Sequence, residues 1–294
     1  DLATLDGRNG FRLDGEHFSS SGASVSSAGD VNGDGLDDVI VGAPEAFHHG
    51  NYSGSSYVVF GKAAGFDAQM DLATLDGHNG FRLDGEYHSS SGASVRSAGG
   101  VNGDGFGDVI VGARGTDHNG EVSGSSYVVF GKATGFDAHM DLSNMESGDG
   151  IRLDGEHDFD LSGFLVSGAG DVNGDGFGDV MVGAPGAAPN GDSSGSSYVI
   201  FGRCDFGSGG GGLPEIKGTD GDDTLKGSEA AEHFLSGAGN DNLLGRGGAD
   251  EFDAGAGNDA IRVGDLTFDS IDGGEGIDAL HLAGADLNLD LTVL

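Results

Sequence analysis

The segment DVNGDGLDDVIVGAP, residues 30–44, joins a dense acidic run directly to an apolar stretch. Oxygen-bearing groups alternate along its first nine residues, and Gly35 at the sixth position permits a sharp bend. This pattern can wrap a loop around a hard cation, because Ca²⁺ takes about six to eight oxygen ligands. The expected ligands are Asp30, Asn32, Asp34, the carbonyl of Leu36, and Asp38.

This segment also has two features in common with other kinds of loop. An EF-hand loop needs a glutamate at its twelfth position and flanking helices, but the twelfth residue here is Val41, inside an apolar, strand-like run. An Asx-turn loop without metal is the second alternative, since Asp and Asn side chains bond readily to nearby backbone groups. The sequence therefore predicts a loop that joins two strands, and favours calcium as its ligand.

Internal repeats decide the architecture. DLATLDGRNGFRLDGE at 1–16 returns with one change at 71–86 and, further altered, at 141–156. GSSYVVFGK at 54–62 returns at 124–132 and, as GSSYVIFGR, at 195–203. The period is 70 residues, as from Asp38 to Asp108, with one extra residue in the third copy before Gly163. The repeats define units 1–70, 71–140 and 141–204.

The acidic loop also recurs in each unit. The third copy keeps every ligand position: Asp171, Asn173, Asp175, the carbonyl of Phe177, and Asp179. The second copy has Gly100 in place of the first aspartate, which leaves Asn102, Asp104, the carbonyl of Phe106, and Asp108. One fewer carboxylate predicts weaker calcium binding in the middle loop.

Each unit contains four short, strand-like segments bounded by Gly, Ser or Asn. In the first unit they cover 23–29, 38–43, 55–61 and, across the unit boundary, 80–85. Four strands per repeated unit are typical of β-propeller blades, which usually close in rings of four to eight. We therefore expect an all-β fold with three four-stranded blades, as a partial propeller or an open array. Blades upstream of Asp1 or from other chains are alternatives, and exposed blade edges would favour a homo-oligomer or fibre.

The composition changes after residue 204. Residues 205–213 predict a flexible, Gly-rich linker. From 214 to 294 the period falls to nine, with one slip at 263–272. Each regular unit has an acidic sixth and an apolar eighth residue, so two units make one coil of a short parallel β-roll with a narrow core. An acidic, Gly-rich linker without metal is the alternative.

Two family resemblances follow from these motifs. The segments DVNGDGLDDVIVGAP and SSYVVFG resemble the FG-GAP repeat of integrin-α-type β-propellers, over residues 1 to about 203. In that family the calcium loop joins the first and second strands of a blade.

The unit GGEGIDALH at 273–281 resembles the RTX, or haemolysin-type, calcium-binding repeat, as do its neighbours over about 217–282. The resemblance implies ions between turns that are two units apart. Asp223, Asp241 and Asp259 would lie on one edge of the roll and Asp250 on the other, where Glu232 and the slip interrupt the pattern. The ligands implied are Asp223, Asp241, Asp250, Asp259 and Asp278.

Charge and motifs exclude several functions. With 13 Lys+Arg against 49 Asp+Glu, the net charge of −36 argues against nucleic acid and anionic membranes as partners. No apolar run approaches the roughly 18 residues of a membrane span. GDSSG at 191–195 fits a G-x-S-x-G motif, but Tyr52 and Val122 stand at the Ser193 position of the other units. The histidines form no HExxH motif, and we expect those in the loops to be solvated. No catalytic activity is expected.

The sequence thus predicts a calcium-binding structural or adhesion module of a large, secreted or surface-attached bacterial protein. Secretion by a type I system is implied by the RTX resemblance. Its partners would be calcium and a cell-surface or matrix protein or glycan. A non-catalytic accessory or secretion tail of a secreted hydrolase is the alternative.

Overall fold

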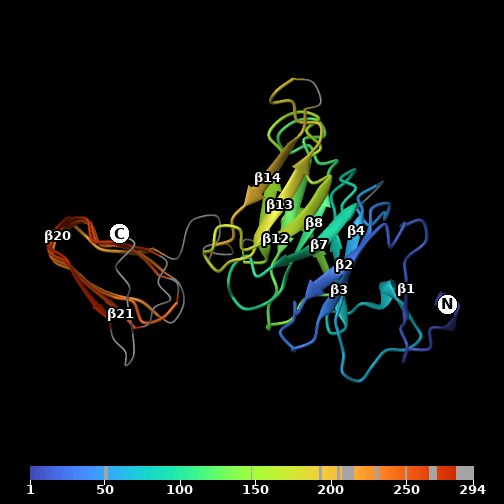
Figure 1. The fold of residues 1–294 in the computed structure, drawn as a ribbon, viewed down its shortest axis with the longest axis horizontal. Helices are drawn as coiled ribbons and strands as arrows, with labels where there is room; N and C mark the ends of the chain where they lie inside the picture. The colour runs from blue at the N-terminus through green and yellow to red at the C-terminus, as the bar shows by residue number, and fades with distance from the viewer. Residues whose placement is uncertain are drawn as a thin grey trace. The chain divides into compact units, whose positions relative to one another are not determined.

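The fold was analysed in a computed structural model that describes residues 1–49, 52–146, 148–191, 194–203, 206, 215–228, 232–248, 250–264 and 270–282. The chain divides into two compact units, Asp1–Gly207 and Ser208–Leu294, which are treated separately below. The all-β prediction is confirmed (Figure 1). The helical segments of the described residues are three short 3₁₀ turns, Leu2–Thr4, Leu72–Thr74 and Leu142–Asn144. None of the described helices has the length and apolar character that crossing a bilayer requires.

The first compact unit contains three antiparallel, propeller-like sheets, called blades 1 to 3 here. Blade 1 consists of β2 (Ser24–Gly29), β3 (Asp38–Ala43), β4 (Ser55–Val59) and β6 (Gly80–Asp84). Blade 2 consists of β7 (Ser94–Gly99), β8 (Asp108–Ala113), β9 (Ser125–Val129) and β11 (Gly150–Asp154). Blade 3 consists of β12 (Leu165–Gly170), β13 (Asp179–Ala184) and β14 (Ser196–Ile200). The strands expected from the first repeat lie where the sequence places them.

Short outer strands connect each blade to the next unit of sequence. β6 and β11 are the fourth strands of blades 1 and 2, and each comes from the beginning of the following unit. β10 (His139–Asp141) adds a parallel fifth strand beside β6, and β5 (Gln69–Asp71) pairs in the same way with β1 (Arg12–Asp14). The three blades therefore have five, four and three strands in the described residues, rather than four each.

The blades stack face to face, with β2 against β7 and β7 against β12. This stacking buries both faces of the inner strands, so that Val109, Ile110 and Val111 of β8 are completely inaccessible to solvent. A continuously apolar strand is typical of a strand that is covered on both faces, as β8 is here.

The second compact unit is a parallel β-roll. One of its sheets contains β15 (Glu215–Lys217), β17 (His233–Leu235), β19 (Glu251–Asp253) and β22 (Ser270–Asp272). The other contains β16 (Thr224–Lys226), β18 (Asn242–Leu244), β21 (Ala260–Val263) and β24 (Ala279–Leu282). β20 (Ala256–Gly257) and β23 (Glu275–Gly276) form a small third pair.

Neighbouring strands of the roll lie one coil apart, and hydrogen bonds between coils join residues 18 positions apart in most of the roll. Two nine-residue units thus make one coil, as predicted. The apolar positions form the core: Phe234, Leu243, Phe252 and Ile261 are buried, and the rings of Phe234 and Phe252 stack at 4.7 Å.

Three sequence predictions concern residues outside the described part of the chain. They are the linker at 205–213, apart from Phe206, the centre of the slip at 265–269, and Ser193 of the GDSSG motif.

Candidate metal-binding loops

Each acidic loop joins the first and second strands of its blade, and the last carboxylate of the loop anchors it. Asp38, the first residue of β3, is buried. Its Oδ2 accepts the N–H of Val31 at 2.9 Å, and its Oδ1 accepts the N–H of Gly61 at 2.8 Å. The anchor therefore ties the loop to the end of β4. Asp108 and Asp179 make the same pair of bonds in blades 2 and 3.

The first carboxylate caps the turn of the loop. Asp30 Oδ1 accepts the N–H groups of Gly33 at 2.8 Å and Asp34 at 3.0 Å, and its Oδ2 accepts that of Gly35 at 2.8 Å. Asp171 makes the same three bonds in the third loop. In the middle loop, Gly100 has no side chain to offer to these N–H groups. The sequence difference at Gly100 thus removes a loop cap as well as a candidate ligand.

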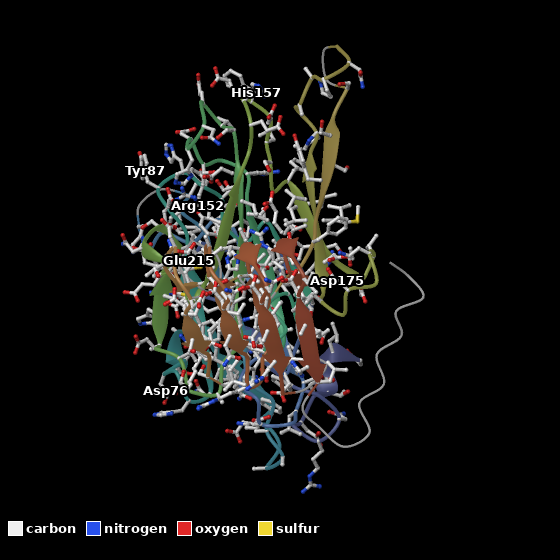
Figure 2. The ribbon with its side chains drawn as sticks, turned by 90° about the vertical axis from the view of Figure 1, so that its left-hand side faces the viewer. Asp76, Tyr87, Arg152, His157, Asp175 and Glu215 are labelled. Carbon is white, nitrogen blue, oxygen red and sulfur yellow. The ribbon has the colours of Figure 1, made fainter. Side chains whose placement is uncertain are left out.

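The remaining side-chain candidates lie at the tip of the loop. Asn32 Oδ1 accepts the N–H of Asp34 at 3.0 Å, and Asp34 Oδ1 accepts that of Leu36 at 2.9 Å. These contacts recur in the other loops, including the one that carries Asp175, which is labelled in Figure 2. Each loop is therefore closed by bonds between its own oxygens and backbone N–H groups.

The anchoring carboxylates lie in an unfavourable electrostatic environment. Burial raises the pKa of Asp38, and the negative charges of Asp34 and Asp30 raise it further, against the two N–H bonds that lower it. Burial likewise raises the pKa of Asp108 to about 7, with a smaller contribution from the charge of Asp104. A cation near these oxygens would favour the ionised form of both carboxyl groups.

The loops of neighbouring blades are in direct contact. The carbonyl of Asp30 accepts the N–H of Gly107 at 2.8 Å, and that of Gly100 accepts the N–H of Gly178 at 2.9 Å. The ring of Phe106 fills the space that a Cβ on Gly33 would need, and Phe177 does so for Gly103. A change in one loop therefore acts directly on the loop of the next blade.

In the β-roll, the acidic sixth positions form a column. Asp241 Oδ1 accepts the N–H of Asp223 at 2.8 Å, Asp259 Oδ1 that of Asp241 at 2.7 Å, and Asp278 Oδ1 that of Asp259 at 3.0 Å. On the other edge, Asp250 Oδ1 accepts the N–H of Glu232 at 2.9 Å. The two edges expected from the sequence are thus occupied by these residues.

The column of the roll leaves buried charge uncompensated. The Oδ2 atoms of Asp241 and Asp259 are buried and have no hydrogen-bond partner among the described residues. Burial raises the pKa of Asp259, and the charges of Asp241 and Asp278 add to this effect. Because an unpaired buried carboxylate is costly, these oxygens also fit a cation.

Within the described ranges, no three or more His, Cys, Asp or Glu side chains are arranged to hold a metal ion. The calcium ligand sets, including the backbone carbonyls of Leu36, Phe106 and Phe177, therefore stay predictions.

A second polar network links the outer strands to the blades, and the sequence did not reveal it. His48 lies between Glu16 (Nε2 to Oε1, 3.2 Å) and Ser55 (Nδ1 to Oγ, 3.1 Å), and Tyr57 donates to Glu16 at 3.1 Å. Glu86, His118, Ser125 and Tyr127 repeat this arrangement.

The loop histidines were expected to be solvated, but the side chains of His48 and His118 are only 20% and 22% exposed. Their shared position in two aligned units was the available signal. The third unit has Pro189 there.

Comparisons with known proteins agree with the repeat assignment. Residues 21–59 and 164–200 match the family model of the FG-GAP repeat. The chain is 32% identical over 173 residues to integrin alpha-PS5 of Drosophila melanogaster, an alignment that covers 59% of this chain and 15% of that protein. It is 30% identical over 172 residues to integrin alpha-3 of Cricetulus griseus, covering 58% and 15%. Integrin alpha-4 of Xenopus laevis is 28% identical over 177 residues, covering 59% and 15%.

The chain spans about 15% of the length of these relatives. The resemblance of the roll to RTX repeats stays a prediction, with which the parallel coils are compatible. Two segments of the first compact unit thus match the FG-GAP repeat, and the unit is similar to one part of the integrin α chains.

Proposed function

We propose that this chain is a calcium-stabilised, extracellular module that serves adhesion or the assembly of a surface structure. The observation that carries the proposal is the crowding of buried carboxylates at two kinds of repeated turn. In the blades these are Asp38 and Asp108, and in the roll Asp241 and Asp259. The similarity to part of the integrin α chains supports an extracellular, adhesion-type role.

In the blades, calcium would be held by the loop oxygens. The first loop would use Asp30, Asn32, Asp34, the carbonyl of Leu36 and Asp38, and the third loop the equivalent set from Asp171 to Asp179. The middle loop, without a carboxylate at Gly100, would bind more weakly. The ion would balance the negative charge of the anchoring carboxylates.

In the roll, Asp223, Asp241, Asp259 and Asp278 would hold ions along one edge, and Asp250 along the other. Since the carboxylates repel one another without a cation, metal binding would supply folding free energy. Secretion from a bacterium by a type I system, and a cell-surface or matrix protein or glycan as partner, are part of this proposal. They rest on the RTX resemblance and on the acidic charge.

Calcium titration of the middle loop tests the role of the first carboxylate. A Cβ on Gly100 would meet only the Phe106 carbonyl, at an ordinary contact distance of 3.5 Å, so Gly100→Asp adds the missing carboxylate without strain. We expect this variant to bind calcium at the middle loop about tenfold more tightly, as measured by calorimetry. Asp171→Gly is the matched change in the opposite direction, and should weaken the third loop similarly.

Thermal melting with and without a chelator gives the second readout. Chelation should lower the melting temperature of both compact units, and most strongly that of residues 214–294. Equal affinity of all three loops in the native chain, or melting unaffected by chelation, would contradict the proposal.

A further inference from the structure

Among the described residues, blade 3 ends on a strand edge that has no partner strand. β4 and β9 each pair with an outer strand, but among the described residues β14 pairs only with β13 (Figure 1). The side chains near this edge are accordingly exposed. Phe201 is 50% exposed, whereas its equivalents Phe60 and Phe130 are 5% and 2% exposed. An unpaired strand beside exposed apolar side chains is a surface that can accept a further strand.

The other two blades show which sequence fits this edge. In blade 1 the strand Arg-Leu-Asp of β6 pairs with β4, with Arg82 opposite Tyr57, Leu83 opposite Ser56 and Asp84 opposite Ser55. Ser55 Oγ donates to Asp84 Oδ1 at 2.8 Å.

Blade 2 repeats this register with Arg152, which is labelled in Figure 2, and the next two residues of β11. Ser125 donates to Asp154 at 2.7 Å. In both blades, therefore, an Arg-Leu-Asp strand pairs with this edge in the same register.

The chain contains a third Arg-Leu-Asp strand, β1, whose inner edge has no strand beside it in the described residues. β1 pairs with β5 alone. Its Arg12–Asp14 ion pair is largely exposed, whereas the Arg82–Asp84 pair is nearly buried. β1 is thus an outer strand without the three inner strands that β6 and β11 have.

The aromatic residues at the two ends are complementary. In blade 1 the stacked rings of Phe81 and Phe136, 4.1 Å apart, each lie 5.9 Å from Phe60. Phe11 and Phe66 form the same stack beside β1, at 3.9 Å. Phe201 occupies the position of Phe60 at the open edge of blade 3. Burying it against such a stack would stabilise the contact by the hydrophobic effect and by aromatic packing.

Charge complementarity points to the same pairing. A hollow of about 300 Å³ in blade 3 is lined by Glu156, Asp158 and Asp160, together with Ser196 and Tyr198. In blade 1 the residue equivalent to Glu156 is Glu16, whose Oε1 lies 3.7 Å from Arg82 Nη1. An arginine from an added strand would therefore place its positive charge in an acidic hollow.

We propose that β1 and β5 of a second copy of this chain complete blade 3. The register follows the internal blades, with Arg12 opposite Tyr198, Leu13 opposite Ser197 and Asp14 opposite Ser196. Phe201 then packs on the Phe11–Phe66 stack of the second copy. If both copies donate, two chains contribute six blades, which is within the range of four to eight at which propellers close.

The contact between copies is weaker than the contacts between blades of one chain. Ser24 and Ser94 accept the N–H groups of Val95 and Val166 across the internal contacts, at 3.0 and 3.1 Å, but blade 3 has Leu165 at this position. Asp37 also replaces the glycine found at 107 and 178. We therefore expect the two copies to dissociate when the protein concentration is low.

Cysteine cross-linking tests the register directly. In a Cys204→Ser background, Leu13→Cys and Ser197→Cys are made on separate chains of residues 1–294 and mixed in calcium under mild oxidation. The internal blades place the equivalent residues opposite each other, so a mixed disulfide dimer is expected. Ser196→Cys, shifted by one residue and therefore facing the other side of the strand, is the control partner for Leu13→Cys and should give little of this dimer.

Sedimentation measures the association itself. The unmodified chain is expected to shift from monomer to dimer as its concentration rises. Phe201→Ser should weaken this association at least about tenfold, since it removes a buried aromatic ring. Phe47→Ser is the matched control, because Phe47 is 47% exposed and belongs to the connection between β3 and β4 of blade 1, not to blade 3.

A monomer at every concentration overturns the proposal. So does an association that Phe201→Ser leaves unchanged, or one that cross-links Ser196→Cys as well as Ser197→Cys. If Phe201→Ser loses the dimer but binds calcium as the unmodified chain does, the result supports the proposal. It also shows that the contact between copies is independent of the proposed calcium function.

Discussion

Gly107 and Gly178 occupy the position that Asp37 has in blade 1. Whether a side chain fits at this position depends on the loop of the preceding blade. A Cβ on Gly107 would lie 3.0 Å from the nitrogen of Asp30 and 3.1 Å from the carbonyl oxygen of Ala28, both backbone atoms. These atoms cannot move without disturbing the first loop. Within one chain, no blade precedes blade 1 among the described residues, so Asp37 meets no such limit in the monomer.

Alanine substitution at this position should therefore have different effects in the two blades. Gly107→Ala is expected to destabilise the first compact unit by about 1–3 kcal/mol, because it overpacks the contact between two loops. Asp37→Ala should change stability by less than about 0.5 kcal/mol. Denaturant unfolding of both variants in calcium gives the comparison. Equal effects would show that the contact between the loops can relax.

At the scale of the element, the coil of the β-roll places like charges in register. The parallel strands repeat every coil, so any acidic residue of the repeat faces its own equivalent in the next coil. Asp241 and Asp259 are buried in this way, each with one unpartnered oxygen. We expect the column to cost stability without a cation and to contribute stability when a cation is bound.

Removing one charge from the column should have opposite effects in the two conditions. In the presence of a chelator, Asp241→Asn is expected to raise the melting temperature of the roll, because the repulsion with Asp259 is relieved. In calcium the same substitution should lower it, because a ligand is lost. Asp253→Asn, at an exposed position on β19, is the control and should have little effect in either condition. A loss of stability in both conditions would contradict the proposed repulsion, since asparagine keeps an oxygen that can accept the N–H of Asp223.

At the scale of the whole molecule, a net charge of −36 makes folding sensitive to protons and cations. The pKa values of Asp38, Asp108 and Asp259 are raised in the folded state, so folding favours their protonated forms. Their contribution to stability is present below the unfolded pKa of about 4 and is lost as the pH rises through the folded values. For Asp108 this value is about 7.

We therefore expect the calcium-free protein to lose stability between about pH 4 and pH 7. The groups with lowered pKa values do not affect this window, since their contributions change only below about pH 4. They are Asp14, Asp76 and Glu215. Calcium should reduce the decline, because it binds the ionised carboxylates. Melting temperatures across this range, with sodium chloride at equal ionic strength in place of calcium as the control, test both statements. A constant melting temperature without calcium would contradict them.

The sequence alone determined the strands, the loops and the coil of the roll. These features are local: the alternation and the glycines of a few residues specify a turn followed by a strand, and repetition makes the pattern unmistakable. The candidate ligands were found for the same reason, because they lie within nine residues of one another. The core positions of the roll followed from the same nine-residue period.

Only the tertiary structure decided which segments complete one another. β5 and β10 are three residues long and carry no pattern of their own, so only the neighbouring outer strand makes them strands. His48 is held by Glu16 and Ser55, and the match between them is visible only when the blade is assembled. Among the described residues β14 likewise pairs with β13 alone, which the sequence of β14 does not reveal. The backbone groups of a strand edge form hydrogen bonds with strands that are distant in sequence. The spacing of residues along the chain does not specify which of these strands pairs with the edge.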